Sequence, residues 1–346
     1  MAQPSSRPAH LVHVVVVSYK TAALVTSLLR SLQNDRANEL DRGTIFRVFV
    51  VDNDSGDAEI LEKLVADSGW QDWVTVFKAP KNGGFAYGNN LGFRHGFEGE
   101  AKPDYFFLLN PDTEVRPGAI STLVDFLDEH PGAGIAASSC EDKHGVLWPF
   151  AFRYPSLASE VDHGLRLRIV SKLLIDHAVL KPMGQSPEQV DWFPGAAMMV
   201  RRQVVEDVGG MDEQYFLYYE ETDYCRKVKQ AGWTLWYVPG SRIMHIAGES
   251  TGVTGEKSLR RRLPAYWFES RRRYFVKNHG LAYATAVDVL FLASHFLGRT
   301  KELLKGRGDE RVPNFWADFL RHSVLHKANR SLSPAQEFKP AQIVRR

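Results

Sequence analysis

Two carboxylates, Asp112 and Glu114, follow directly after an apolar run at 105–109. We expect the run to be a buried strand that ends before Pro111, because proline has no N–H to donate to a sheet ladder. Acids at the C-terminal end of a parallel strand lie where α/β folds bind ligands. Their hard oxygen atoms at this spacing suit Mg²⁺ or Mn²⁺ holding a phosphate. A polar turn with helix-capping acids would give the same pattern, so this stretch alone leaves both interpretations open.

A second acidic cluster, Glu220, Glu221 and Asp223, follows aromatic residues at 216–219. These acids open a predicted helix, where acidic side chains are common and stabilising. The aromatic neighbours would also desolvate them in part. Desolvation and like charge both raise a carboxylate pKa, which suits a general base.

Glycine and asparagine are dense where a predicted strand passes into a predicted helix, at Asn82, Gly83, Gly84 and Asn89. Glycine permits positive φ and close backbone approach, and the helix start offers free N–H groups to an anion. A turn explains Asn82 and Gly83 but not the residues that continue into the helix. This segment therefore favours ligand binding.

Two earlier strands also end in polar residues, the first at Ser18 and Tyr19 and the second at Asp52 and Asn53. Acid and amide groups there could contact the edge of a nucleobase, although a polar turn is the simpler interpretation of Asp52 and Asn53. The sequence contains neither G-x-G-x-x-G nor G-x-x-x-x-G-K-[ST] at these positions, so it supports neither a dinucleotide fold nor a P-loop.

The segment after residue 190 adds two weaker signals. Trp192, Pro194 and Gly195 form a bend that would line a pocket or belong to the core. A lone histidine such as His245 is usually structural. It becomes a metal-ligand candidate only if the fold brings it near Asp112.

Composition limits the class of protein. The chain has 346 residues, 44% of them hydrophobic, which predicts one large or two modest domains. A net charge of +2 does not indicate a polyanionic partner. Two cysteines far apart fit a reducing compartment rather than a disulfide framework. The first ten residues lack the apolar region of a signal peptide and are expected to be a disordered lead-in.

Predicted strands and helices alternate through the first 140 residues. Strands without internal alternation, separated by helices, imply βαβ units and a parallel sheet covered on both faces. The predicted strands are 11–17, 46–51, 74–77, 105–109 and 134–138, and the predicted helices are 22–33, 58–67, 87–96 and 119–129. Later predictions are helices at 165–180 and 218–231, a strand within 190–201 and a short strand at 235–238.

The C-terminal part begins with a basic, aromatic stretch at 257–277 and an apolar run at 281–297. The run has 17 residues, fewer than the roughly 20 needed to span a bilayer. Asp288, His295 and Arg299 fall on one helical stripe, which predicts an in-plane helix beside anionic lipid. Packing on the rest of the chain, a homo-oligomer interface, a solvated face or a nucleic-acid site are the alternatives.

Taken in order, these motifs resemble the inverting GT-A glycosyltransferases of family 2, in particular the rhamnosyltransferase-like branch. The matching segments, within residues 11–252, are VVVVSY, VVDNDS, NGGFAYGNNLG, FFLLNPDTE, WFPGAAMMVRR, GGMDEQYFLYYEETDYCRKVKQAGW and HIAGES. The resemblance implies a GT-A fold with a mostly parallel central sheet, a nucleotide-diphosphate-sugar donor, a divalent metal (Mg or Mn) and a hydroxyl acceptor.

The resemblance also implies residue roles. The metal ligands would be Asp112, Glu114 and His245, and the base Glu221, with Glu220 as the alternative because the family's second acid is usually Asp. The nucleotide-binding residues would be Ser18, Tyr19, Asp52, Asn53, Asn82, Gly83, Gly84 and Asn89. For the acceptor we predict contacts with Trp192, Pro194, Gly195 and Asp223.

The expected organisation is a catalytic domain at 11–255, with a nucleotide-sugar half (11–140) and an acceptor half (141–255). A helical extension (256–305) and a polar tail (306–346) follow. We expect transfer of L-rhamnose from dTDP-rhamnose to a lipid-linked or polysaccharide acceptor, in the cytoplasm on the inner face of the plasma membrane. A non-catalytic sugar-binding protein is the second hypothesis. A nucleic-acid-binding protein that uses the Arg clusters is the third, and the modest net charge opposes it.

Overall fold

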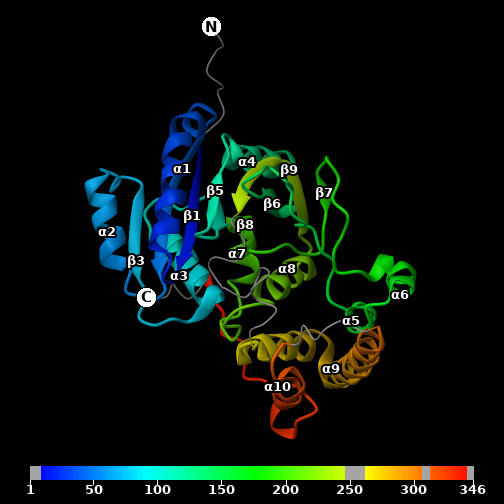
Figure 1. The fold of residues 1–346 in the computed structure, drawn as a ribbon. Helices are drawn as coiled ribbons and strands as arrows, with labels where there is room; N and C mark the ends of the chain where they lie inside the picture. The colour runs from blue at the N-terminus through cyan, green and yellow to red at the C-terminus, as the bar shows by residue number, and fades with distance from the viewer. Residues whose placement is uncertain (1–8, 246–261, 306–311, 341–346) are drawn as a thin grey trace.

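A mixed sheet forms the centre of the computed structural model, which describes residues 9–245, 262–305 and 312–340 (Figure 1). Eight of its strands follow the order β3-β2-β1-β4-β8-β6-β9-β5, and β7 pairs with β9. The strands are β1 (His10–Ser18), β2 (Thr44–Asp52), β3 (Val74–Lys78), β4 (Tyr105–Leu109), β5 (Thr113–Val115), β6 (Ala133–Glu141), β7 (Glu188–Gln189), β8 (Ala197–Arg201) and β9 (Thr234–His245). The helices are α1 (Ala22–Asp41), α2 (Ala58–Asp67), α3 (Gly84–Glu98), α4 (Ala119–Glu129), α5 (Leu157–Leu165), α6 (Arg168–Leu173), α7 (Arg202–Val208), α8 (Glu220–Gln230), α9 (Ala265–Leu304) and α10 (Phe315–His322), with short 3-10 turns η1 (Ile175–His177) and η3 (Lys327–Asn329).

The N-terminal half of the sheet is parallel, as the alternation of strands and helices predicts. Strands β1, β2, β3 and β4 are in parallel register, with Ser18 beside Asp52 and Asp52 beside Lys78. Helices α1 and α4 contact one face of the sheet, and α3, α7 and α8 contact the other. Because both faces are covered, β1 and β4 are buried along most of their length rather than at alternate residues. The edge strand β3 is mostly exposed.

The second half of the sheet brings distant segments of the chain together. Strand β8 runs antiparallel to both β4 and β6, and β9 runs parallel to β6. The predicted short strand at 235–238 is only the start of β9, which continues to His245 and pairs there with β5. The pairing sets Thr113 opposite His245, directly beside Asp112.

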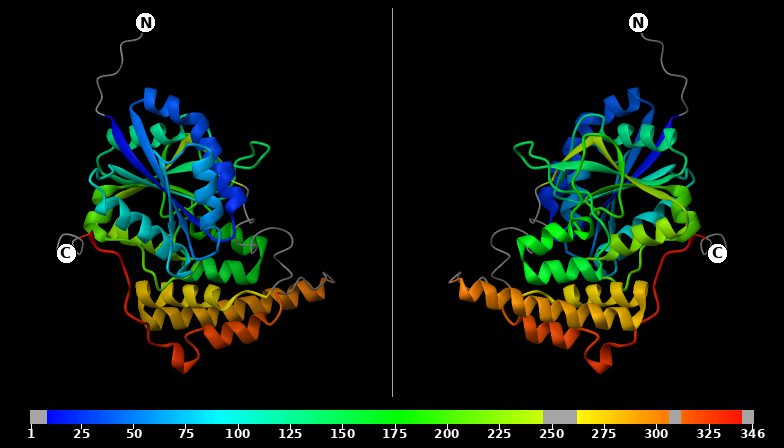
Figure 2. Two further views of the ribbon diagram at one scale, coloured as in Figure 1. Left: turned by 90° about the vertical axis from the view of Figure 1, so that its left-hand side faces the viewer. Right: turned by 90° about the vertical axis from the view of Figure 1, so that its right-hand side faces the viewer.

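The C-terminal helices form a layer along one end of the sheet domain (Figure 2). Helix α9 changes direction at Gly280, where φ is +81°. Its second half lies so close to α5 that a Cβ atom on Gly298 would stand 2.3 Å from the carbonyl oxygen of Gly164. The predicted extension is therefore packed against the sheet domain.

One sequence prediction in this region is wrong in detail. The segment 165–180 contains only α6 and η1, because Arg166 adopts a left-handed backbone (φ 49°) that ends α5. The tail after 306 is structured over 312–340: α10 packs on α9, and Phe338 is buried in the main core. Residues 1–8, 246–261, 306–311 and 341–346 of the predicted segments lie outside the described residues.

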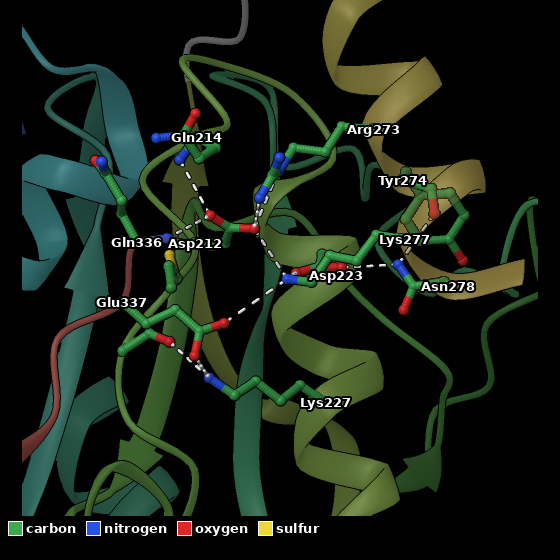
Figure 3. A network of polar contacts seen from close by, with 12 residues as sticks. Asp212, Gln214, Asp223, Lys227, Arg273, Tyr274, Lys277, Asn278, Gln336 and Glu337 are labelled. Carbon is green, nitrogen blue, oxygen red and sulfur yellow. Dashed lines mark hydrogen bonds and ion pairs between the residues drawn. The ribbon is translucent and has the colours of Figure 1, made fainter. Parts of the chain in front are cut away.

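A network of ion pairs joins α8, α9 and the tail (Figure 3). The Lys277 ammonium group lies 3.0 Å from a carboxylate oxygen of Asp212 and 2.7 Å from one of Asp223. Arg273 also pairs with Asp212, and the backbone N–H of Gln336 donates to the same side chain. Both aspartates are buried, so each depends on these partners for charge compensation.

The same contacts exclude the nucleic-acid hypothesis for part of the Arg cluster. Arg271 is 3% exposed and pairs with Glu160 and Asp288. Arg273 is 6% exposed and pairs with Asp212. Guanidinium groups that are buried in ion pairs are not available to phosphates.

Replacing Lys277 by Met should lower the free energy of unfolding by about 3 kcal/mol, because it leaves buried carboxylates short of a partner. Burial alone would raise the pKa of Asp212, but the charges of Lys277 and Arg273 outweigh it and hold that pKa low. This stabilisation is fully present above the pKa that Asp212 has in the unfolded chain. It disappears as pH falls through the lower pKa that Asp212 has in the folded protein. The stability difference between variant and wild type should therefore narrow in acid.

The measurement is urea unfolding of both proteins at several pH values. Lys63→Met is the matched control, because Lys63 pairs with Asp67 on the surface at side-chain exposures of 76% and 65%. A Lys277 variant that unfolds at the same urea concentration as this control would contradict the role of the network.

Candidate active site

A cavity of about 1160 Å³ lies at the C-terminal edge of β1, β2 and β4 and reaches the start of α9. This is the edge at which α/β sheets bind ligands. Its wall combines polar groups from the strand ends, carboxylates of α8 and a group of aromatic side chains. The lining residues are Val17, Tyr19, Thr21, Asn53, Asn82, Gly84, Phe85, Asn110, Pro111, Pro155, Ser159, Glu160, Asp162, His163, Ala178, Val179, Leu180, Trp192, Pro194, Phe216, Leu217, Tyr218, Tyr219, Glu220, Glu221, Thr222, His245, Tyr266 and Trp267.

Asn53 organises the side of the cavity where the resemblance places the nucleotide. Its amide nitrogen donates to the Asn82 side chain and to the Gly84 carbonyl, each at 3.1 Å, and its amide oxygen accepts from the Gly83 N–H. The end of β2 is thereby tied to the turn that starts α3. Asn53, Asn82 and Gly84 line the cavity together with Tyr19, so the structure brings these predicted residues to one wall.

Other predicted nucleotide-binding residues lie behind that wall. The Ser18 hydroxyl is buried against the Thr21 hydroxyl at 2.9 Å. Asp52 is fully buried and accepts from the Ser55 N–H. Asn89 lies inside α3 and donates to the Phe85 carbonyl. These side chains shape the wall rather than line it, and Gly83 is likewise outside the lining.

Asp112 and His245 form the centre of the predicted metal site. Asp112 is 2% exposed, and neither of its carboxylate oxygens has a hydrogen-bond partner within the described part of the chain. The Nε2 atom of His245 lies 3.2 Å from Asp112 Oδ1. A buried carboxylate with no hydrogen bond is costly. Asp112 and the His245 imidazole beside it are therefore candidate ligands for a cation.

Glu114, the third predicted ligand, is not among the residues that line the cavity. Among the described residues, no group of three or more His, Cys, Asp or Glu side chains could hold a metal ion. The predicted set of three is thus reduced to Asp112 and His245. This number still fits Mg²⁺-class ions, which are usually bound through one or two protein groups together with substrate phosphates.

Glu220 and Glu221 open α8 and both face the cavity. Glu220 is 1% exposed, and its carboxylate oxygens have no hydrogen-bond partner among the described residues. Burial raises the pKa of Glu220 well above its ordinary range, and the neighbouring Glu221 raises it further. Burial also raises the pKa of Glu221, whose Oε1 atom accepts from the Gly195 N–H at 3.2 Å.

An unusual backbone delivers these two acids. Tyr218 and Tyr219 have φ values of 70° and 67°, a left-handed conformation that is uncommon for bulky residues. Just before them, the Phe216 carbonyl accepts from the Phe85 N–H. Strain of this kind persists only where surrounding contacts enforce it, and it is concentrated at functional sites.

Of the four residues predicted to bind the acceptor, two line the cavity and two do not. Trp192 and Pro194 line the cavity, and the Trp192 indole N–H donates to the Arg153 carbonyl. Gly195 contributes its N–H to Glu221. Asp223 is turned away from the cavity lining and is held by Lys277 and Asn278, so its placement gives it a structural role.

Sequence analysis missed the far end of the cavity. Ser159, Asp162 and His163 come from α5, the segment 178–180 follows η1, and Tyr266 and Trp267 come from α9. No local motif marks the first two groups. The aromatic residues near 266 are evident in the sequence, but their position beside the cavity depends on the packing of α9.

Comparisons with known proteins show the family to which the chain is similar. The model of "Glycosyl transferase family 2" matches residues 13–154, and that of "Glycosyl transferase family group 2" matches residues 105–299. An N-acetylglucosaminyl-diphospho-decaprenol L-rhamnosyltransferase of Mycobacterium tuberculosis is 32% identical over 164 residues, which are 43% of this chain and 49% of that protein. The match thus spans about half of that relative's length.

Two further similarities cover more of the chain. Rhamnosyltransferase WbbL of Escherichia coli (strain K12) is 24% identical over 78% of this chain and 96% of its own length. The crystal structure of GalNAc-T7 with UDP, GalNAc and Mn²⁺ superimposes with a TM-score of 0.55 at 14% identity, over 91% of this chain and 58% of that one. That likeness confirms the predicted GT-A fold.

Replacing Gly84 by Ala should weaken nucleotide binding and stability. Gly84 has φ +86°, and a Cβ atom there would lie 1.9 Å from the Phe216 carbonyl oxygen. We call the cavity wall formed by Tyr19, Asn53, Asn82 and Gly84 the nucleotide wall, because we expect the nucleotide to lie there. The clash would push apart the loop that carries part of this wall and the loop that precedes Glu220 and Glu221. We expect a loss of about 1–3 kcal/mol in stability beyond the cost of the backbone conformation.

Gly56→Ala separates the two effects, because Gly56 has φ +89° but open space around its Cβ position. Thermal unfolding and calorimetry with dTDP and UDP are the measurements. Equal behaviour of the two variants would show that the approach of Phe216 to Gly84 has no role.

Proposed function

Because the chain belongs to the family 2 glycosyltransferases, we propose that it is an inverting, metal-dependent enzyme that transfers a hexose from a nucleotide diphosphate to a hydroxyl group. One observation carries the proposal. A single cavity has His245, beside the buried Asp112, in one part of its wall, and Glu220 with Glu221 in another. A site for a cation and diphosphate thus faces the same space as a candidate general base.

A divalent metal, Mg²⁺ or Mn²⁺, would be held by Asp112 and His245 and would supply positive charge to the diphosphate as it leaves. Asn53, Asn82 and Gly84 form the adjoining wall, where a nucleotide would lie against the start of α3.

Glu221 is the proposed general base. Its carboxylate takes the proton of the acceptor hydroxyl while the acceptor oxygen bonds to the anomeric carbon and the bond to the diphosphate breaks. A single displacement of this kind inverts the anomeric centre. The Gly195 N–H fixes the Glu221 carboxylate by one oxygen and leaves the other for the acceptor.

The proposed donor is dTDP-L-rhamnose and the proposed acceptor a lipid-linked or polysaccharide sugar. The names of the M. tuberculosis and E. coli relatives support rhamnose, and the former name describes an acceptor carried on a polyprenyl diphosphate. The aromatic side chains of Trp192, Tyr266 and Trp267 give the cavity surfaces on which sugar rings can stack. We place the reaction in the cytoplasm, at the inner face of the plasma membrane.

The non-catalytic alternative has less support. A protein that only bound a sugar would gain nothing from burying Glu220 and Asp112 without hydrogen-bond donors among the described residues. Such groups are costly to a fold and are typical of sites that move protons or hold cations. Hydrolysis of the donor by purified protein would distinguish the two functions.

Replacing Asp112 by Asn should abolish the metal-dependent part of nucleotide binding, because a neutral amide is a much poorer cation ligand. The measurement is calorimetry with dTDP or UDP, with and without Mn²⁺. Wild type should bind more tightly with the metal, whereas Asp112→Asn should bind equally in both conditions. A variant that keeps the full enhancement by Mn²⁺ would remove Asp112 from the metal site.

Replacing Glu221 by Gln should lower turnover by about 10²–10⁴-fold while donor binding is retained. Glu220→Gln is the matched variant and should keep measurable turnover. Since burial raises the pKa of the base and only its deprotonated form accepts a proton, activity should fall on the acid side at a higher pH than for an ordinary glutamate. An inactive Glu220→Gln beside an active Glu221→Gln would reverse the assignment.

A further inference from the structure

The second half of α9 presents an apolar face to the outside of the molecule. Val289, Leu290, Phe296 and Leu297 are 48%, 39%, 62% and 59% exposed. Residues three, four and seven apart lie on one side of a helix, so these side chains form one stripe. Leu303 and Leu304 extend it to the end of the helix, at exposures of 53% and 84%.

The polar residues of this helix point the other way, toward the protein. Asp288 is 2% exposed, pairs with Arg271 and accepts from the Val324 N–H. The His295 ring lies 5.0 Å from the ring of Phe315 and 5.1 Å from that of Trp316, both on α10. Two residues of the predicted polar stripe, Asp288 and His295, are therefore packed against the protein.

Close packing fixes this orientation. A Cβ atom on Gly164 of α5 would stand 2.0 Å from the Ser294 hydroxyl oxygen. Rotating α9 would break that contact and expose Asp288. The helix is long and apolar enough to cross a membrane, but a crossing would carry the Arg271–Asp288 pair into hydrocarbon, so the structure favours contact along the side of the helix.

The stripe continues onto neighbouring elements. The Phe296 ring lies 6.4 Å from the ring of Trp316, which is 36% exposed on α10. At the other edge, the Lys301 ammonium group donates to the Arg166 carbonyl just before α6. Helix α6 exposes Ile169 and Leu173 at 69% and 78%. We call this set the docking face: Val289, Leu290, Phe296, Leu297, Leu303 and Leu304 of α9, Trp316 and Leu320 of α10, and Ile169 and Leu173 of α6.

Basic residues outnumber acidic ones among the exposed side chains of the segments that carry the docking face. In the segments 166–177, 281–305 and 312–330, Asp176 is the one acidic residue in the exposed class. The exposed basic residues of the same segments are Arg166, Arg168, Lys172, Lys305, Arg321, Lys327 and Arg330. An apolar strip with a cationic rim is complementary to acyl chains beneath anionic headgroups.

We propose that the docking face binds the surface of an anionic bilayer, with α9 lying in the plane of the membrane. The charge of the rim favours lipid over a second copy of this chain, whose own basic rim would repel it. Residues 178–180, which follow α6, and Tyr266 and Trp267, at the start of α9, line the cavity. The docked protein would thus hold this acceptor end of the cavity, where we expect the acceptor to bind, near the bilayer. This inference rests on the proposed lipid-linked acceptor.

The test is co-sedimentation of the full-length protein with vesicles of phosphatidylcholine alone or mixed with phosphatidylglycerol. Wild type should bind the anionic vesicles, and salt should weaken the binding. The double variant Phe296→Glu/Leu297→Glu should bind at least about tenfold more weakly, because charge replaces apolar contact. The matched control Ile60→Glu/Val146→Glu changes two residues that are each 61% exposed elsewhere, and it should bind like wild type.

Affinity for dTDP or UDP, measured on the same proteins, separates this proposal from the proposed reaction, since the docking face is outside the nucleotide wall. Wild type that ignores anionic vesicles would overturn the proposal, as would a Phe296→Glu/Leu297→Glu variant that binds them normally. Sedimentation velocity tests the alternative that a second copy of this chain covers the docking face. A wild-type dimer that ignores vesicles and becomes monomeric in this variant would show a subunit interface instead.

Discussion

The fold depends on how negative charge is buried around α8. Asp212 and Asp223 are compensated by Lys277 and Arg273 of α9, so α9 is required to hold α8 in place. Glu220, three residues before Asp223 on the same helix, has no such cation beside it among the described residues and keeps a raised pKa. Buried pairs add little net stability, but a missing partner is costly. The C-terminal helices thus neutralise the structural acids and leave the acids of the cavity free to bind a proton.

Strand order and strained turns convert this scaffold into a site. Parallel pairing places the ends of β1, β2 and β4 side by side, and the antiparallel return of β9 brings His245 from a distant part of the chain to Asp112. The left-handed Tyr218 and Tyr219 then aim the start of α8 at the same space. The close approach of Gly84 to the Phe216 carbonyl joins the two sides, so the proposed nucleotide wall and the proposed base depend on the same contact.

Sequence analysis succeeded where local patterns decide the structure. The apolar runs of β1, β2 and β4 and the polar residues that follow them are readable from the chain alone, and so is the cluster at Glu220. It failed where a contact with a residue far along the chain determines the role of a side chain. Asp223 has the same local context as Glu221, but Lys277 determines its role. Glu114 satisfies the spacing of a metal motif, yet it is not part of any three-residue ligand group among the described residues.

The direction of α9 shows the same limit and connects the two ends of the molecule. Helical periodicity identifies a polar stripe but not whether water or protein faces it. Here Arg271 neutralises Asp288, which allows that stripe to be buried and leaves the apolar side outward. Arg271 also pairs with Glu160, a residue of the cavity wall. A movement of the second half of α9 must therefore either carry Glu160 with it or separate a buried ion pair, so the proposed membrane contact and the acceptor end of the cavity are mechanically linked.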